Sequence, residues 1–228
     1  MIFQKNKIKT VVFDLDDTLI PSSQFYHDSY LLCGIDSQGE NFKTAKELVK
    51  KSLGNNHTSS HNRILYFKKY LELENNFTSK NLISLVTKYN FYLKLLIKDF
   101  IEKSKRNLLF RQLKEKYTLA IITNETTLSQ IIKLEEIDSN GEFFSNIITS
   151  EEIGVEKPSD EIYQYFFKTC QTLPENCLFV GDNFTTDLQK PILLGASTIL
   201  TQEFNNENDD YQINCTKIKS LEELKEVL

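Results

Sequence analysis

The chain has 228 residues, of which 40% are hydrophobic and 26% charged, and this composition is ordinary for a folded protein with a buried core. Its net charge of −5 argues against nucleic-acid binding, which requires a basic surface. No apolar run reaches the roughly 20 residues of a membrane helix, and the N-terminus does not resemble a signal peptide. We therefore expect a cytoplasmic protein without nucleic-acid or membrane partners. The composition leaves open whether it is a monomer or a dimer.

The four cysteines are scattered, with neither a CxxC pair nor metal-ligand spacing among Cys33, Cys170, Cys177 and Cys215. Reduced thiols are the ordinary state of cysteines in the cytoplasm. We expect all four to be free.

Five short apolar runs rich in β-favouring residues predict strands, at Thr10–Leu15, Leu119–Thr123, Asn146–Thr149, Leu178–Gly181 and Ser197–Leu200. Their nearly continuous apolar character is typical of parallel strands covered on both faces. Helical periodicity follows the later strands, at Thr127–Glu136, Asp160–Gln171, Thr186–Leu194 and Ser220–Leu228. This alternation predicts an α/β fold with a Rossmann-like parallel sheet of about five strands.

The segment between the first two strands is far longer than one crossover helix. It predicts several helices and no strand, with the main candidates at Ala45–Leu53, Asn62–Leu73, Ser79–Phe100 and Ile101–Lys116. We expect residues 1–20 and 105–228 to form the core and residues 21–104 to form an inserted helical cap. Polar loops are predicted at Gly54–His61, which contains His57 and His61, and at Asn205–Asp210. The aromatic residues of the cap are expected to serve helix packing, at Phe67, Tyr70, Phe77, Tyr89, Phe91, Tyr92 and Phe100.

Every notable polar group of the core follows a predicted strand. Three carboxylates follow the first strand, a threonine and an asparagine end the second, a lysine follows the third, and two carboxylates follow the fourth. They are Asp14, Asp16, Asp17, Thr123, Asn124, Lys157, Asp182 and Asp187. Because ligands of open α/β sheets bind at the carboxyl ends of the strands, we expect these side chains to meet there.

Carboxylates gathered at one sheet edge repel one another unless a cation joins them. The clustered acceptors are hard oxygen atoms without cysteine or histidine, which favours Mg²⁺ over zinc. A divalent ion beside a lysine makes a site for a phosphate group, and an ionised carboxylate there can attack phosphorus. Asp17 and Thr18 are expected to stabilise the turn after the strand.

Four short motifs occur in order on the expected elements: DLDDTL at 14–19, IITN ending at Asn124, EKP at 156–158 and GDNFTTD at 181–187. Together they resemble the motifs of the haloacid dehalogenase superfamily. The resemblance covers essentially the whole chain, including the helical insertion after the first motif. It implies a sheet in which the first strand lies between the second and the fourth.

The resemblance also implies roles for the acidic residues. Asp14 matches the nucleophile that forms a phosphoaspartate, and Asp16 matches the general acid/base, whose backbone carbonyl also reaches the metal. Asp182 matches the main acidic metal ligand, with Asp187 either a second ligand or a support for Lys157. The implied Mg²⁺ ligands are thus Asp14, Asp16, Asp182 and Asp187.

The remaining roles concern the phosphate. Thr123 matches the hydroxyl that holds the phosphoryl oxygens, and Lys157 matches the cation that neutralises them. Asn124 is either a helix cap or a substrate contact. Asn183 is a candidate to orient a carboxylate or to meet a metal-bound water.

We therefore predict a Mg²⁺-dependent phosphatase that hydrolyses a small phosphorylated metabolite. The family's dehalogenases lack the acid/base aspartate, which Asp16 supplies here. A phosphonatase would need a lysine from the cap, among Lys50, Lys51, Lys68 and Lys69, and nothing else supports it. A sugar phosphomutase would share every core residue, and a non-catalytic relative that binds a partner is a further alternative. The motifs give a weak resemblance to nucleotidases and acylneuraminate-phosphate phosphatases.

Overall fold

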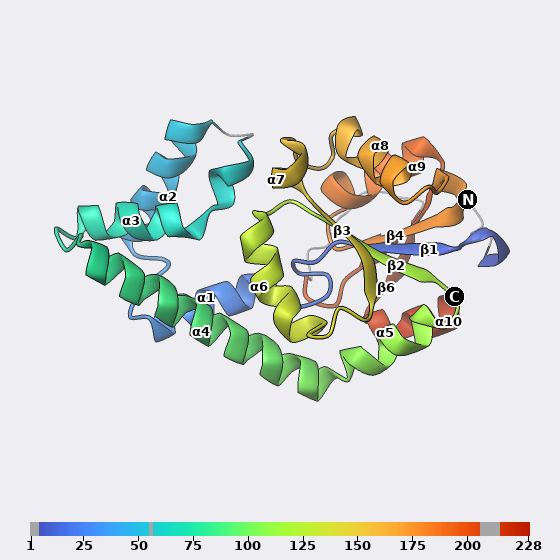
Figure 1. Cartoon of the computed structure of the whole chain (residues 1–228), viewed down its shortest axis with the longest axis horizontal. Coiled ribbons are helices and arrows are strands. Elements are labelled where there is room, and N and C mark those ends of the chain that lie inside the picture. The colour runs from blue at the N-terminus through green and yellow to red at the C-terminus, as the bar shows by residue number, and fades with distance from the viewer. Residues whose placement is uncertain (1–4, 55–56, 206–214) are drawn as a thin grey trace.

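A computed structural model describes residues 5–54, 57–205 and 215–228. Its centre is a six-stranded, fully parallel sheet in the order β3-β2-β1-β4-β5-β6 (Figure 1). The strands are β1 Thr10–Phe13, β2 Thr118–Thr123, β3 Phe144–Thr149, β4 Cys177–Gly181, β5 Ser197–Thr201 and β6 Thr216–Ile218. The α/β prediction and the central place of β1 are confirmed. The sixth strand was missed because β6 has three residues and two of them are exposed.

Both faces of the sheet are covered, as its continuously apolar strands require. In β1, Val11 and Phe13 join one apolar cluster, and Val12 between them joins the other. The first cluster contains Phe110, from the helix after the cap segment, and the second contains Phe166, from the helix before β4. The core helices are α5 Arg106–Lys114, α6 Thr127–Ile137, α7 Ser150–Ile153, α8 Asp160–Thr169, α9 Gln189–Leu194 and α10 Leu224–Val227.

Two helices predicted near the C-terminus are divided. The segment predicted as Thr186–Leu194 is a π-helical turn at Phe184–Leu188 followed by α9. The segment predicted as Ser220–Leu228 is a 3₁₀ turn at Leu221–Glu223 followed by α10. The π-helical turn places Asp187 beside the end of β4.

Between β1 and β2 the chain forms the helices α1 Ser22–Leu32, α2 Glu40–Leu53, α3 Arg63–Leu73 and α4 Ser79–Ser104. They lie to one side of the sheet, and α4 leads back to α5 (Figure 1). The sequence did not predict α1, because its buried positions include Ser22 and Ser29 and so lack a clear apolar period. The predicted break after Phe100 was also wrong. The helix breaks at Lys105, whose φ of 57° is left-handed.

Aromatic packing forms the core of this helical segment, in part as predicted. Tyr30, Phe42, Phe67 and Tyr89 are buried, with the Tyr30 and Tyr89 rings stacked at 5.4 Å and the Phe67 and Tyr89 rings edge-on at 5.0 Å. Phe77 and Phe91 do not serve this packing as the sequence predicted, because 41% and 62% of their surfaces are exposed.

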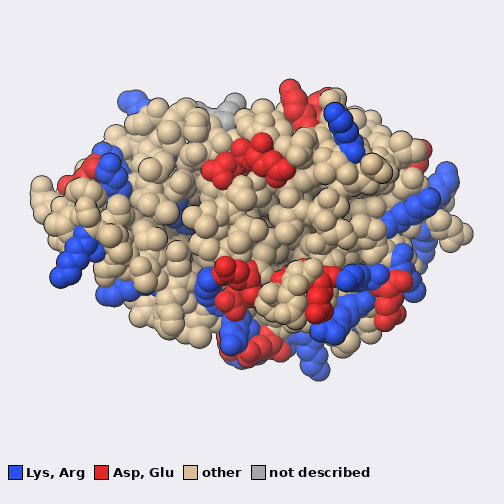
Figure 2. Space-filling model, in the orientation of Figure 1, with Lys and Arg blue, Asp and Glu red and all other residues tan. Residues whose placement is uncertain are grey.

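On the face drawn in Figure 2, acidic and basic residues are mixed along the lower edge, where α4 and α5 run in Figure 1. Ion pairs such as Lys103 with Asp99, at 2.7 Å, reflect this mixing.

All four cysteines are free, as predicted. No helix within the described ranges has the length and apolar character to cross a membrane. Of the two predicted polar loops, residues 55–56 and 206–210 lie outside the described part of the chain.

Candidate active site

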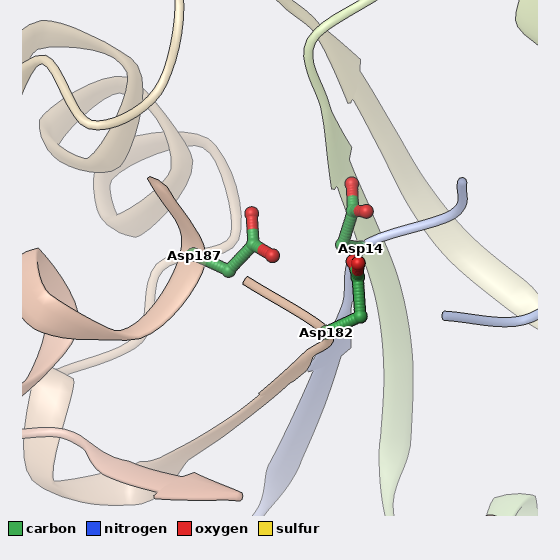
Figure 3. Close-up of side chains that lie close together, drawn as sticks. All are labelled: Asp14, Asp182 and Asp187. Atoms are coloured by element: carbon green, nitrogen blue, oxygen red, sulfur yellow. The ribbon is translucent and has the colours of Figure 1, made fainter. Parts of the chain in front are cut away.

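Three carboxylates meet at the carboxyl edge of the sheet. Asp14 follows β1, Asp182 follows β4, and Asp187 comes from the π-helical turn, with one oxygen of each within 4.8 Å of the others (Figure 3). The neighbouring strands bring them together, because Phe13 pairs with Val180 and the Asp14 amide donates to the Val180 carbonyl at 2.9 Å. Asp182 also accepts a hydrogen bond from the Thr18 hydroxyl at 3.2 Å.

The three carboxylates of the cluster lie close together and repel one another when ionised. Burial, together with Asp187, Asp182 and Asp16, raises the pKa of Asp14 well above its usual range, although Lys157 opposes this shift. Burial and the neighbouring Asp187 raise the pKa of Asp182 to about 7. A divalent cation would relieve this repulsion, and the oxygen-only ligand set suits a hard cation such as Mg²⁺.

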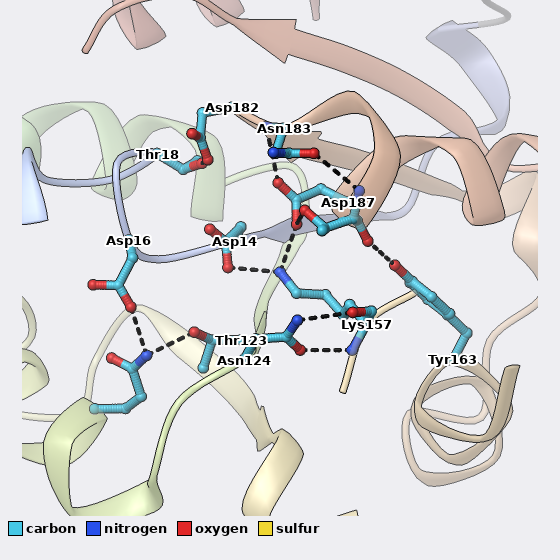
Figure 4. A network of polar contacts seen from close by, with 12 residues as sticks. Asp14, Asp16, Thr18, Thr123, Asn124, Lys157, Tyr163, Asp182, Asn183 and Asp187 are labelled. Atoms are coloured by element: carbon cyan, nitrogen blue, oxygen red, sulfur yellow. Dashed lines mark hydrogen bonds and ion pairs between the residues drawn. The ribbon is translucent and has the colours of Figure 1, made fainter. Parts of the chain in front are cut away.

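Lys157 bridges two of these carboxylates from the β3–α8 connection. Its ammonium is buried and lies 2.7 Å from Asp14 Oδ1 and 2.8 Å from Asp187 Oδ1 (Figure 4). Burial lowers its pKa, but the charges of Asp14 and Asp187 outweigh burial and hold the pKa above its usual value. The two ion pairs therefore place the ammonium of Lys157 beside the candidate nucleophile.

Asn124 holds the backbone of Lys157. Its amide donates to the Lys157 carbonyl at 2.9 Å and accepts from the Lys157 N–H at 2.6 Å (Figure 4). The helix-cap alternative for Asn124 was wrong, because Thr126 is the residue at the N-cap of α6. A contact with substrate stays a prediction.

Asp187 is held by the start of its own helix. Its Oδ2 accepts from the Asn183 backbone N–H at 3.1 Å, and its Oδ1 accepts from the Thr186 hydroxyl at 3.1 Å. The Asn183 side chain caps the turn by accepting from the Thr186 N–H at 3.1 Å. Asn183 thus orients a carboxylate, but through its backbone and on Asp187 rather than on its neighbour Asp182. Asp187 in turn supports Lys157.

Gly181 leaves the space that Asp187 occupies. A Cβ added at Gly181 would lie 2.5 Å from Asp187 Cβ and 2.6 Å from its Oδ2. We expect Gly181→Ala to lower kcat by roughly a hundredfold, because a displacement of about 1 Å in a catalytic site costs on that order. Steady-state kinetics with p-nitrophenyl phosphate measures the effect, and a circular dichroism spectrum like that of the wild type shows that the variant is folded. Undiminished kcat would contradict this role of the glycine.

Asp16 points away from the cluster, into a set of three donors. Tyr26 of α1 donates to its Oδ1 at 2.7 Å, Lys133 of α6 lies 2.5 Å from the same oxygen, and Gln130 donates to its Oδ2 at 2.8 Å. Burial raises the pKa of Asp16, but the charge and hydrogen bond of Lys133, with the other donors, bring it well below the usual range. Gln130 also donates to the Thr123 hydroxyl at 2.7 Å, which links Asp16 with Thr123 (Figure 4).

The sequence reasoning missed Lys133, Gln130 and Tyr26. The first two carried a usable signal, because they lie three residues apart on α6 among its apolar buried positions. Lys133 has no exposed side-chain surface. A lysine on an apolar helix face is a reason to search for a carboxylate partner.

The turn residue Asp17 behaves as predicted. Its φ is 54°, and its carboxylate accepts from the backbone N–H of Ser23 at 2.9 Å and from the hydroxyl of Ser23. Thr18 instead contacts the metal-site candidate Asp182.

The helical segment contacts the sheet edge through charged side chains. Arg63 Nη1 lies 2.9 Å and 3.0 Å from the two carboxylate oxygens of Glu125, which follows Asn124. His61 lies 3.5 Å from Glu156, beside Lys157. The side chain of His61 is 37% exposed, and His57 is exposed and caps a short turn by accepting from Ser59 N–H at 3.1 Å. A surface role for both histidines stays a prediction.

The model of one protein family, the haloacid dehalogenase-like hydrolases, matches residues 8–189. The chain belongs to this family. It is therefore a hydrolase, and the match spans all four motifs, from Asp14 to Asp187.

Curated relatives and solved structures agree with this family. A glyceraldehyde 3-phosphate phosphatase of Methanothermobacter thermautotrophicus is 28% identical over 97% of this chain and 100% of its own. A ribulose-1,5-bisphosphate 5-phosphatase of Halopiger xanaduensis is 27% identical over 83% of each chain. The putative hydrolase YfnB from Bacillus subtilis, in a magnesium-bound crystal structure, superposes with a TM-score of 0.67 and 24% identity over 97% of this chain and 98% of that one. The similarity to the YfnB structure shows a shared fold and nothing further.

Proposed function

We propose that this protein is a Mg²⁺-dependent phosphatase that hydrolyses a small phosphate monoester through a phosphoaspartate on Asp14. The observation that carries the proposal is the contact of a buried lysine, Lys157, with Asp14 at the edge where Asp182 and Asp187 also lie. Phosphoryl transfer depends mainly on positioning and on neutralising charge, and this arrangement supplies both.

Asp14 would attack phosphorus in line with the leaving oxygen. Lys157 would neutralise the phosphoryl oxygens, and the Thr123 hydroxyl, which already accepts from Gln130, would have its proton free to donate to them. Asp14, Asp182, Asp187 and the Asp16 backbone are the proposed ligands of Mg²⁺, which would add positive charge to the site when bound.

Asp16 would serve as the acid and base. It would protonate the leaving oxygen and later accept a proton from the water that hydrolyses the phosphoaspartate. The three donors around its carboxylate suit the second role in the described arrangement. The first role requires the leaving group to displace some of these contacts.

A small sugar phosphate is the substrate class that the relatives favour, because their names specify glyceraldehyde 3-phosphate and ribulose 1,5-bisphosphate. We propose that residues 21–104 act as a cap over the leaving group, with Arg63 and Glu125 as one contact between cap and core. Closing such a cap would exclude water from the site. The cap would also leave room for small metabolites rather than phosphoproteins.

Phosphate release by the purified protein tests this proposal. With p-nitrophenyl phosphate and a panel of sugar phosphates we expect turnover with Mg²⁺, and a loss of roughly a hundredfold or more with EDTA because the metal supplies several kcal/mol of charge stabilisation. Readdition of Mg²⁺ should restore the rate. An isomeric sugar phosphate in place of inorganic phosphate would indicate a mutase, and no turnover on any substrate would favour a partner-binding protein.

A further inference from the structure

A polar cavity separate from the candidate active site lies within the helical segment. It is walled by α1, α2 and the start of α3. Its volume is about 250 Å³, somewhat below the roughly 300–1,000 Å³ of pockets for drug-sized ligands, so it suits a smaller metabolite. Lys46, Lys50 and Arg63 line it together with His27 and His61. No aspartate or glutamate is among the described residues of the lining. This is unusual in a chain whose net charge is −5.

The two lysines lie one turn apart on the same face of α2, and both are half-buried. Within the described part of the chain, neither makes an ion pair or a side-chain hydrogen bond. Burial, and after it the charges of Lys50, Arg63 and Lys43, lowers the pKa of Lys46. Lys46 and Lys50 therefore lie close to other cations without a counter-ion of their own, and a bound anion would offset that repulsion.

Arg63 connects this cavity with the sheet edge. It pairs with Glu125 through one nitrogen, Nη1, and its guanidinium stacks 3.5 Å from the centre of the Tyr26 ring. Its Nε is buried and has no hydrogen-bond partner among the described residues. A buried N–H without a partner is costly.

The cavity adjoins the loop between β1 and α1, which carries Asp14, Asp16 and Asp17. Two residues of its lining hold carboxylates of that loop, since Tyr26 donates to Asp16 and Ser23 donates to Asp17. His61, also in the lining, lies against Glu156 next to Lys157. The cavity thus lies on the other side of Tyr26 and Ser23 from the loop that follows Asp14.

We propose that this cavity binds a second anionic group of the substrate, so that the enzyme selects metabolites with a phosphate monoester at one end and a phosphate or carboxylate at the other. The inference rests on the proposed phosphatase activity and specifies its substrate class. Lys46 and Lys50 would supply the charge that holds this group, and Arg63, also in the lining, would add to it.

Matched substrate pairs test the preference. Fructose 1,6-bisphosphate against fructose 6-phosphate adds a phosphate, and 3-phosphoglycerate against glycerol 3-phosphate adds a carboxylate. We expect the wild type to favour the doubly anionic member of at least one pair by about tenfold in kcat/KM, the effect of one or two charge-assisted hydrogen bonds. The pair that shows the preference identifies the group.

The double variant Lys46→Gln/Lys50→Gln should remove this preference, mainly through a higher KM for the doubly anionic member. Lys51→Gln, an exposed position on the same helix, is the matched control and should leave the preference unchanged. The inference is overturned if the wild type shows no preference in either pair, or if the double variant keeps it.

Direct binding separates this inference from the proposed activity. Calorimetric titration of Asp14→Asn protein with each sugar phosphate, in Mg²⁺, needs no turnover. We expect fructose 1,6-bisphosphate or 3-phosphoglycerate to bind about tenfold more tightly than its singly anionic partner, and Lys46→Gln/Lys50→Gln to abolish the difference. If nothing is hydrolysed but this difference is found, the phosphatase proposal fails and the second anion site stands. Equal affinities would refute the site.

Discussion

We expect Asp14→Asn to lower kcat by roughly four orders of magnitude or more, because it replaces the proposed attacking carboxylate by an amide that cannot form a phosphoaspartate. Single-turnover and steady-state assays with p-nitrophenyl phosphate measure the loss. The geometry explains why no neighbour takes over the attack: Asp187 accepts at both oxygens from Lys157, Thr186 and Asn183. Asp16 points toward Lys133.

The same substitution should not weaken the fold. In metal-free protein it removes one of three crowded carboxylates, and Lys157 keeps Asp187 as its partner. We therefore expect the melting temperature of metal-free Asp14→Asn protein to equal or exceed that of the wild type. Activity within tenfold of the wild type would refute the assignment of Asp14, and unfolding of the variant would refute this account of the cluster.

Asp16→Asn has the largest expected effect on stability. It leaves the fully buried ammonium of Lys133 without its carboxylate, with only the Tyr26 ring face, at 5.0 Å, and polar neighbours nearby. Removing one partner of a buried pair typically costs 3–5 kcal/mol; because Asp16 is partly exposed we expect about 3 kcal/mol. Urea denaturation followed by circular dichroism measures this loss in the free energy of unfolding.

A second substitution separates the buried charge from other causes. Lys133→Met has a similar length and removes the ammonium, so the double variant Asp16→Asn/Lys133→Met should recover to within about 1 kcal/mol of the wild type. Its kcat should stay as low as that of Asp16→Asn, because the acid/base carboxylate is still missing. A double variant as unstable as Asp16→Asn would show that the pair does not determine the loss.

The pattern of apolar strands and polar residues along the chain was enough to predict which side chains meet at the candidate active site. Asp14, Lys157 and Asp182 could be predicted to meet because each follows an apolar strand, and parallel strands end at one edge. The order β2-β1-β4 followed from the family resemblance and is confirmed. The predicted ends of helices were less accurate. The break at Lys105 was missed because a single left-handed residue hardly changes the apolar period of a long helix.

The surroundings of Asp16 depended on packing between distant segments. Tyr26 comes from a helix that the sequence did not predict, and Lys133 lies 117 residues from the carboxylate that it contacts. The apolar period of α6 indicates that Lys133 faces inward, but helix periodicity specifies a face and not the carboxylate which that face meets.

By itself, the sequence of this protein determined which side chains meet at the sheet edge, because strand ends place Asp14, Lys157 and Asp182 there by a general rule of parallel sheets. Only the tertiary structure decided the partners of Asp16 and the cationic cavity of Lys46, Lys50 and Arg63. Both depend on how helices from separate parts of the chain pack together, and side-chain contacts across such packing are not encoded in any local spacing.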